Sequence, residues 1–498
     1  MDLKYLKSGT DIRGVALGEY NKLTDDVIKK LVFGFVKVLE KKTNISPSNM
    51  KVSVGFDSRL SSERIRKCVE NSLLSLGVDC ISCGMSSTPA MFMTTIKLGC
   101  TGAIQITASH LPYDKNGLKF FTKDGGFEGA DIDKIIGYAE NLDAYPYSQP
   151  GTIEKVKFMS RYAQDLRSMI LKVLDNGDKP LENIHIIVDA GNGVGGFYAT
   201  QVLEPLGADI SHSQFLEPDG NFPNHIPNPE DKTAMKSICD AVKEHNADLG
   251  VIFDTDVDRA ACVDSNGNEI NRNRLVALAS AIVLETYPGG TIVTDSVTSD
   301  GLKTFIEELG GKHHRFKRGY KNVINEAIRL NDNNIEAPLA IETSGHAAFK
   351  ENYFLDDGAY LITKIIIKFA QLRKEGKDIS DLLVSLKEPK EAIEYRLKIL
   401  DGDFRTYGNN VIKELEDYSK QFDFITIAND NHEGIRLSFD KNNGNGWLLL
   451  RLSVHDPILP LNIESNEFGG AAKIKSVFVD FIKKFDKLDV SCFETNEL

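Results

Sequence analysis

The sequence predicts an α/β protein with several α/β domains in series and a smaller C-terminal α+β domain. Short apolar runs typical of buried strands recur along the chain, and each ends in a loop with Gly, Asp or Ser. Between these runs lie amphipathic segments with apolar residues at helical spacing, such as residues 24–42 and 62–77. Buried strands that alternate with helices are typical of α/β proteins, whose sites lie beyond the carboxyl ends of the strands.

Changes in composition along the chain predict where the domains meet. A chain of 498 residues is long enough for three or four domains of ordinary size. Breaks are expected near residues 141–152, 263–273 and 386–395, and residues 422–465 have the pattern of an antiparallel meander, followed by a helix at about 469–485. The expected domains, three α/β and one α+β, are 1–150, 151–267, 268–388 and 389–498.

The overall charge and the apolar runs exclude several classes of function. A net charge of −13 disfavours binding to nucleic acid or to acidic membrane surfaces. The opening residues have no apolar core of signal-peptide length, and the longest apolar run, residues 275–287, is too short to span a membrane. Seven scattered cysteines fit reduced intracellular thiols. We therefore expect a cytoplasmic protein, a monomer or weak homo-oligomer, that acts on small molecules.

Three carboxylates follow one strand-like run. In "VIFDTDVDRA", Asp254, Asp256 and Asp258 occupy alternate positions, which share one face if the chain is extended. Neighbouring carboxylates repel one another unless a cation neutralises them, and oxygen ligands favour a hard ion such as Mg²⁺. The pattern predicts a magnesium site. An aspartyl-phosphate hydrolase with Asp254 as the nucleophile is the alternative enzyme.

A serine and a histidine follow another strand-like run, "QITASHLPYDKNGLKF". Ser109 lacks the G-x-S-x-G spacing of a hydrolase nucleophile, and no Ser-His-Asp partners are evident in the sequence. The stretch by itself therefore leaves the role of Ser109 open.

Two later stretches offer groups suited to sugars and phosphates. "AIETSGHAAF" spaces Glu342, Ser344 and His346 at alternate positions, and a carboxylate accepts hydrogen bonds from vicinal hydroxyls. "RLSVHDP" places Arg451 and Ser453 on one strand face, and a guanidinium beside a hydroxyl suits a phosphate. In isolation, a capping loop with a core histidine is the favoured explanation of the first stretch, and a solvated strand face explains the second at least as well as a binding role does.

Two basic, Gly-bounded stretches complete the set. "SGTDIRGV" predicts Arg13 in a turn, and "KRGYKNV" places Lys317, Arg318 and Lys321 around Gly319. Both stretches are also compatible with ordinary surface charge.

Five motifs, taken together and in this order, resemble the signature set of the α-D-phosphohexomutase family, in its phosphomannomutase/phosphoglucomutase branch. They are "SGTDIRG", "TASHLPYDKNGLKF", "DTDVDR", "ETSGH" and "RLSVHDP". The resemblance spans about residues 8–480. It implies three α/β domains and a smaller C-terminal α+β domain around one central cleft. It also implies interconversion of hexose 1-phosphate and hexose 6-phosphate, of mannose or glucose, through a phosphoserine and a hexose 1,6-bisphosphate that also acts as activator.

The same resemblance assigns roles to individual residues. Ser109 would carry the phosphoryl group, Lys119 and Arg13 would assist proton transfer and stabilise charge, and His110 would position the nucleophile. The Mg²⁺ ligands would be Ser109, Asp254, Asp256 and Asp258, with Arg259 in the same loop. The substrate would be bound by Glu342, Ser344, His346, Gly319, Tyr320, Arg451, Ser453 and His455.

The chain departs from the family pattern in its substrate loops. His455 replaces a common Thr. Either Pro460 or Asn462 stands where some members have a basic residue. Thr343 replaces a frequent Met or Gln, and Tyr320 replaces a frequent His. These departures bear on the choice of sugar and on the phosphate contacts. Two other functions are considered, a Mg²⁺-dependent sugar-phosphate phosphatase and a catalytically silent sugar-phosphate-binding protein. The silent protein would most naturally have lost Ser109 or one of the metal ligands.

Overall fold

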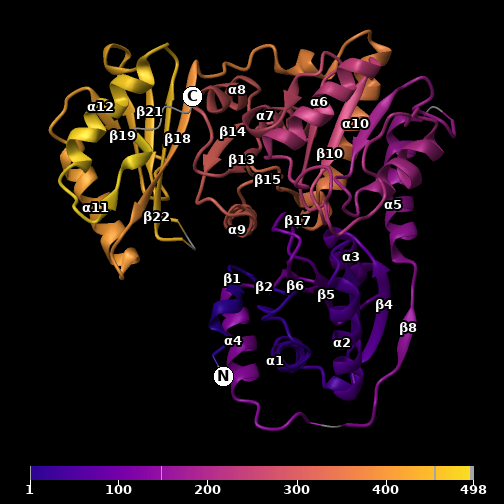
Figure 1. Ribbon diagram of the computed structural model, residues 1–498. Coiled ribbons are helices and arrows are strands. Elements are labelled where there is room, and N and C mark those ends of the chain that lie inside the picture. The colour runs from indigo at the N-terminus through magenta and orange to yellow at the C-terminus, as the bar shows by residue number, and fades with distance from the viewer. Residues whose placement is uncertain (1, 147, 176, 454–455, 494–498) are drawn as a thin grey trace. The chain divides into compact units, whose positions relative to one another are not determined.

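The computed structural model describes residues 2–146, 148–175, 177–453 and 456–493. They form two compact units, each made of two stretches of chain (Figure 1). The first unit contains Met1–Asn271 and Ser344–Asp381, and the second contains Arg272–Thr343 and Leu382–Leu498. Within the described part of the chain, no helix has the length and apolar character needed to cross a bilayer.

The N-terminal part of the first unit is an eight-stranded mixed sheet. Its strand order is β1-β2-β6-β5-β3-β4-β8, with β7 paired to β6. The strands are Lys7–Ser8 (β1), Asp11–Val15 (β2), Lys51–Phe56 (β3), Asp79–Met85 (β4), Gly102–Ile106 (β5), Lys115–Thr122 (β6), Gly125–Gly126 (β7) and Ile153–Lys155 (β8). β3 runs parallel to β4 and β5, whereas β6 runs antiparallel to β5 and β2. This antiparallel return brings β6 back beside the loop that follows β5.

Four helices pack on this sheet, and they are Asp25–Thr43 (α1), Ser62–Ser75 (α2), Thr88–Lys97 (α3) and Gly129–Glu140 (α4). The first two match the amphipathic segments seen in the sequence; the Thr24 hydroxyl caps α1 by accepting from the Val27 amide. Phe35 of α1 stacks on Phe120 of β6 with ring centroids 4.9 Å apart. α1 and α4 approach closely at Gly34, where a Cβ would lie 2.3 Å from the Ile135 carbonyl oxygen.

The rest of the first unit is built on a four-stranded sheet of order β12-β11-β10-β9. The strands are Ile186–Asp189 (β9), Leu249–Phe253 (β10), Ala260–Val263 (β11) and Glu269–Ile270 (β12). β9 and β10 are parallel, and β10 pairs antiparallel with β11. Its helices are Phe158–Leu174 (α5), a π-helix at Tyr198–Leu203, Lys232–His245 (α6) and Gly358–Lys374 (α10). The antiparallel pair Ala347–Phe349 (β16) and Leu355–Asp356 (β17) precedes α10.

The second unit begins with three parallel strands in the order β14-β13-β15. They are Thr291–Thr294 (β13), Lys312–Arg315 (β14) and Leu339–Ile341 (β15), and they alternate with the helices Arg272–Thr286 (α7), Asp300–Glu308 (α8) and Tyr320–Asp332 (α9).

The second unit ends in a six-stranded antiparallel sheet of order β19-β20-β21-β22-β18-β23. The strands are Glu391–Ile399 (β18), Ile425–Ile427 (β19), Ile435–Phe439 (β20), Gly446–Leu450 (β21), Ile458–Ser465 (β22) and Leu488–Asp489 (β23), with helices Phe404–Ser419 (α11) and Gly470–Ile482 (α12). The predicted meander and following helix are therefore present, and the predicted α/β architecture with a C-terminal α+β part is confirmed.

Short 3₁₀ turns complete the described structure, at Lys4–Leu6, Pro47–Asn49, Glu204–Leu206, Lys350–Asn352, Ile379–Leu383, Lys441–Asn443 and Ser491–Phe493.

Candidate active site

The loop between β5 and β6 buries Ser109 beside the carboxylates predicted from the sequence. Ser109 is 3% exposed, and its hydroxyl donates a hydrogen bond to Asp254 Oδ2 at 3.1 Å. The same Oγ lies 3.3 Å from Nδ1 of His110. Two loops separated by more than a hundred residues thus meet at one serine oxygen.

The carboxylates of Asp254, Asp256 and Asp258 converge, because an oxygen of each lies within 4.8 Å of the others. The loop that carries them is not extended, so that part of the sequence prediction is wrong. β10 and β11 are antiparallel neighbours, and the chain must reverse between them. The reversal includes a left-handed backbone at Val257, with φ of 65°. A turn therefore gathers the three carboxylates.

Lys119 of β6 reaches this carboxylate group from the first sheet. Its Nζ forms an ion pair with Asp258 and lies 3.3 Å from Asp256 Oδ2. Burial and the neighbouring Asp258 and Asp256 charges raise the pKa of Asp254 well above its usual range. Burial would also raise the pKa of Asp258, but Lys119, His346 and Arg259 outweigh it, and the pKa is lowered.

The donor set fits a divalent cation. Asp256 Oδ1 and Asp258 Oδ1 are buried and have no hydrogen-bond partner among the described residues. Unpaired buried carboxylate oxygens are costly, and hard cations prefer oxygen ligands. The acidic group can therefore hold a metal ion.

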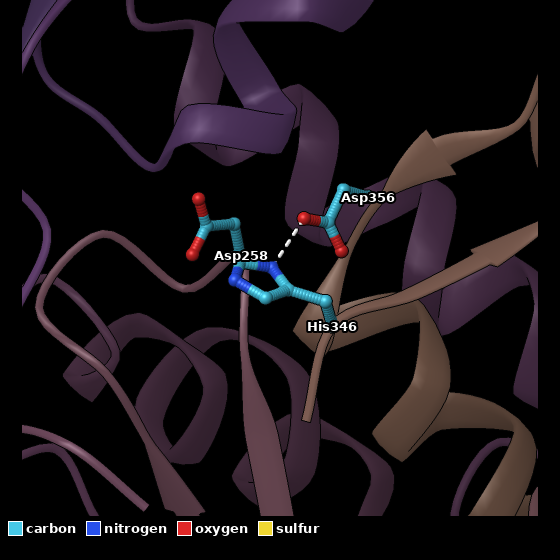
Figure 2. A group of neighbouring side chains, drawn as sticks. All are labelled: Asp258, His346 and Asp356. Atoms are coloured by element: carbon cyan, nitrogen blue, oxygen red, sulfur yellow. Dashed lines mark hydrogen bonds and ion pairs between the residues drawn. The ribbon is translucent and has the colours of Figure 1, made fainter. Parts of the chain in front are cut away.

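His346 lies next to the same carboxylates and pairs with Asp356 (Figure 2). Its Nδ1 donates to Asp356 Oδ2, and Asp356 is 8% exposed. Burial alone would lower the pKa of His346, but Asp356, with a smaller contribution from Asp258, raises it to about 9. His346 is therefore an imidazolium at neutral pH.

His110 has the opposite electrostatic environment. Burial, with the Arg259 and Arg13 charges, lowers its pKa to about 2. His110 is therefore neutral and offers Nδ1 to Ser109 as a hydrogen-bond acceptor or donor according to its tautomer.

Arg13 does not lie in a turn, contrary to the sequence prediction. It belongs to strand β2, directly opposite Gly117 of β6, and pairs with Asp11 at 2.8 Å. Gly117 provides the room, because a Cβ there would lie 3.1 Å from Arg13 Cγ. Arg259 is also in the first unit, fully buried, with Nε 3.2 Å from Asp254 Oδ2.

The second unit holds another part of the predicted substrate set. The Gly319 amide donates to Glu342 Oε1 at 2.6 Å, and Tyr320 begins α9 directly after this glycine. Thr343 donates its hydroxyl to Asp295 Oδ2 at 2.8 Å. Ser344 and His346, which follow in the chain, belong to the first unit.

Arg451 follows β21 in the second unit. Its main-chain N–H donates to Pro460, and that of Ser453 donates to Ile458, so the pairing with β22 continues past the end of β21. Arg451 Nε is buried without a hydrogen-bond partner among the described residues, and burial lowers the pKa of this guanidinium. His455 lies outside the described residues.

Three residues that interact with these groups were not predicted from the sequence. Asp356 holds His346; Thr88 donates to Asp256 Oδ2 at 2.5 Å; and Glu433 accepts from the Arg318 amide at 3.1 Å. The pair "DD" between a strand and a helix was a signal for Asp356. No local pattern marked Thr88 or Glu433.

Comparison with known proteins identifies the family of the chain. Three family models match, for phosphoglucomutase/phosphomannomutase alpha/beta/alpha domains I, II and III, at residues 6–145, 160–267 and 271–388. A phosphomannomutase/phosphoglucomutase of Pseudomonas syringae pv. tomato is 30% identical over 475 residues, covering 95% of this chain and 94% of that protein. One from Pseudomonas aeruginosa PAO1 is 30% identical over 87% of this chain and 88% of its own length.

A solved structure of a phosphoglucomutase/phosphomannomutase family protein from Burkholderia thailandensis superposes with a TM-score of 0.81 at 26% identity, covering 97% of this chain and 98% of that one. The family models together match well over half of the chain, and the Pseudomonas relatives match nearly all of it. The chain therefore belongs to the phosphoglucomutase/phosphomannomutase family and is a phosphohexomutase.

Proposed function

We propose that this phosphohexomutase interconverts the 1- and 6-phosphates of glucose and mannose through a phosphoserine at Ser109 and a hexose 1,6-bisphosphate. The observation that carries the proposal is the buried Ser109 hydroxyl, 3.1 Å from Asp254 within a group of three carboxylates. A serine in this setting needs no Ser-His-Asp base, because it acts as a carrier of a phosphoryl group.

Mg²⁺ is the proposed cation, held by Asp254, Asp256, Asp258 and the Ser109 oxygen. It would supply charge that offsets the phosphoryl oxygens during transfer. The unpaired oxygens of Asp256 and Asp258 support this assignment, and Lys119 and Arg259 provide further positive charge beside the same carboxylates.

Each half of the reaction exchanges one P–O bond for another. In the first, the Ser109 Oγ–P bond breaks, the vacant sugar hydroxyl forms a P–O bond and gives up its proton, and the Ser109 oxygen regains one. In the second, Ser109 loses its proton and accepts the other phosphoryl group of the bisphosphate, and the released sugar oxygen takes up a proton. The products are the isomeric hexose phosphate and phosphoserine.

His346 is the proposed acid for the released sugar oxygen. Its pKa of about 9 keeps it protonated at neutral pH, and Asp356 holds the ring through Nδ1. After donating in the second half-reaction, it would be reprotonated by the proton that Ser109 gives up in the same step, whereas in the first half-reaction the proton of the sugar hydroxyl replaces the phosphoryl group on the Ser109 oxygen. His110, which is neutral, is proposed to orient Ser109. Lys119 and Arg13 are proposed to assist proton transfer and to stabilise charge.

Glu342 and Ser344 are proposed to bind the sugar hydroxyls in both orientations, with Gly319 and Tyr320 bordering them. Arg451 and Ser453 are proposed to bind the phosphate that is not transferred. A buried guanidinium with an unpaired Nε supports this role for Arg451.

The test is a ³¹P NMR assay with Mg²⁺ and a trace of glucose 1,6-bisphosphate. Glucose, mannose, glucosamine and N-acetylglucosamine 1-phosphates are offered separately. The proposal expects conversion of the glucose and mannose compounds to 6-phosphates without release of inorganic phosphate. Accumulation of inorganic phosphate would contradict it in favour of a phosphatase, and conversion of only the amino sugars would contradict the proposed substrates.

A further inference from the structure

Ser109 has a backbone conformation that a serine rarely adopts. Its φ is 51°, in the left-handed region, which is unfavourable for a residue with a Cβ. Such a conformation persists only when the surroundings fix it. The groups that hold the Ser109 amide and carbonyl therefore determine where its hydroxyl points.

The amide side is held by Thr107. The Ser109 N–H donates to Thr107 Oγ1 at 2.8 Å. Burial raises the pKa of Asp57, and the neighbouring Thr107 side chain is among the groups that lower it. Asp57 is completely buried at the end of β3, and Ser62 donates to it at 2.8 Å.

The carbonyl side is held by Arg59, whose side chain is completely buried. Its Nη2 donates to the carbonyl oxygens of Ser109 and Leu111. Its Nη1 donates to those of Pro112, at 2.6 Å, and Lys115, at 3.0 Å. One planar guanidinium thus binds four carbonyl groups between Ser109 and Lys115, a segment called the serine loop below. The single ammonium of a lysine does not have the geometry to bind all four.

The Asp57 carboxylate fixes Arg59. Arg59 Nε lies 3.2 Å from Asp57 Oδ2, and the Arg59 amide donates to Asp57 Oδ1 at 3.1 Å. The Phe222 ring lies against the guanidinium, 5.3 Å from its centre. A buried ion pair with its hydrogen bonds satisfied, as here, favours one specific geometry.

We propose that Asp57, Arg59 and Thr107 form a clamp that positions Ser109 for phosphoryl transfer. They act through the Ser109 main chain, and so they are positioning residues. The clamp keeps Oγ directed at Asp254 while the loop exchanges a neutral hydroxyl for a phosphate ester. This inference rests on the proposed role of Ser109.

The test measures the rate at which glucose 1,6-bisphosphate phosphorylates Ser109, by intact-protein mass spectrometry, together with kcat and KM. Thr107→Val keeps the side-chain shape but removes the hydroxyl, and Thr107→Ser restores it. We expect Thr107→Val to slow phosphorylation and kcat roughly 100-fold, as a small misplacement of a reacting group does. KM should change less than about threefold, and Thr107→Ser should stay within about threefold of the wild type.

Arg59→Lys provides an independent arm, with the same expected loss of kcat at nearly constant KM. Arg167→Lys is the control, because Arg167 also donates to a main-chain carbonyl, that of Gln201, but away from the serine loop. Wild-type phosphorylation rates in folded Thr107→Val or Arg59→Lys protein would overturn the clamp. So would an equal loss in Thr107→Ser, which would trace the effect to packing.

The proposed function and the proposed clamp would be contradicted by different results. If the wild-type protein takes no phosphoryl group from the bisphosphate on Ser109, the proposed function is wrong. If the wild type is phosphorylated and the clamp variants match it, only the clamp is wrong.

Discussion

Ser109 has two independent attachments to its surroundings, its hydroxyl at Asp254 and its main chain at the clamp. If the hydroxyl carries the phosphoryl group, its removal eliminates the covalent intermediate but leaves the main-chain contacts intact. We expect Ser109→Ala to lower turnover roughly 1,000-fold or more, as loss of a nucleophile does, with an unchanged melting temperature. The measurement is the coupled mutase assay, with Ser82→Ala, another buried serine of the same sheet, as control. Near-normal turnover of folded Ser109→Ala protein would contradict the phosphoserine.

His346 and Asp356 predict a specific pH dependence. Because Asp356 holds the His346 pKa near 9, Asp356→Asn should lower that pKa, since burial disfavours the charged ring. The His346 ring signals, titrated by NMR without added metal, report this directly. The alkaline limb of the kcat profile should move to lower pH in the same variant.

The same shift has a stability consequence of known sign. The raised pKa contributes stability below about pH 6.5, the unfolded value, and that contribution is lost as the pH rises towards 9. Asp356→Asn should flatten this part of the pH-stability curve. Asp357→Asn is the matched control, since Asp357 is its buried neighbour but caps α10 and bonds to Tyr162. An unchanged His346 titration in Asp356→Asn would contradict the assignment.

At the scale of elements, the contact of α1 with α4 depends on a missing side chain. Gly34→Ala should gain roughly 1 kcal/mol of helix propensity, but its Cβ would meet the Ile135 carbonyl at 2.3 Å. We expect the clash to dominate and the free energy of unfolding to fall by about 1–3 kcal/mol. Gly137→Ala in α4 is the control, because nothing lies within 4 Å of its Cβ, and it should be neutral or stabilising. Equal effects of the two variants in denaturant titrations would contradict this packing.

The elements predicted from the sequence are those whose signals are local. α1 has apolar residues at helical spacing and a Thr24 cap, and both are readable along the chain. The error at Arg13 has a physical reason: the flanking glycines suggested a turn, but Gly14 instead allows close packing within β2, since a Cβ there would lie 2.6 Å from Leu6 Cδ2. The partners Thr88 and Asp356 depend on tertiary contacts, and Arg59 acts on carbonyl oxygens, which leave no trace in the sequence.

At the scale of the molecule, a divalent cation should stabilise the fold. Three buried carboxylates repel one another, and an ion that binds only the folded state raises stability by mass action. We expect the melting temperature to rise with Mg²⁺ concentration and turnover to vanish in a chelator and return with Mg²⁺. Differential scanning fluorimetry gives the first result and the mutase assay the second. Asp258→Asn should reduce the Mg²⁺-dependent shift, whereas a chelator-resistant enzyme with no shift would contradict the metal site.

The discontinuity of the first unit has a consequence for biosynthesis. His346 and Asp356 are made after the whole of Arg272–Thr343, which belongs to the second unit. Between translation of Asn271 and of Asp381, on the order of ten seconds pass at ordinary elongation rates. During that interval the nascent chain already holds Ser109 and the three aspartates but lacks β16, β17 and α10. On the ribosome, His346 and Asp356 therefore arrive with the last segment of the first unit, Ser344–Asp381.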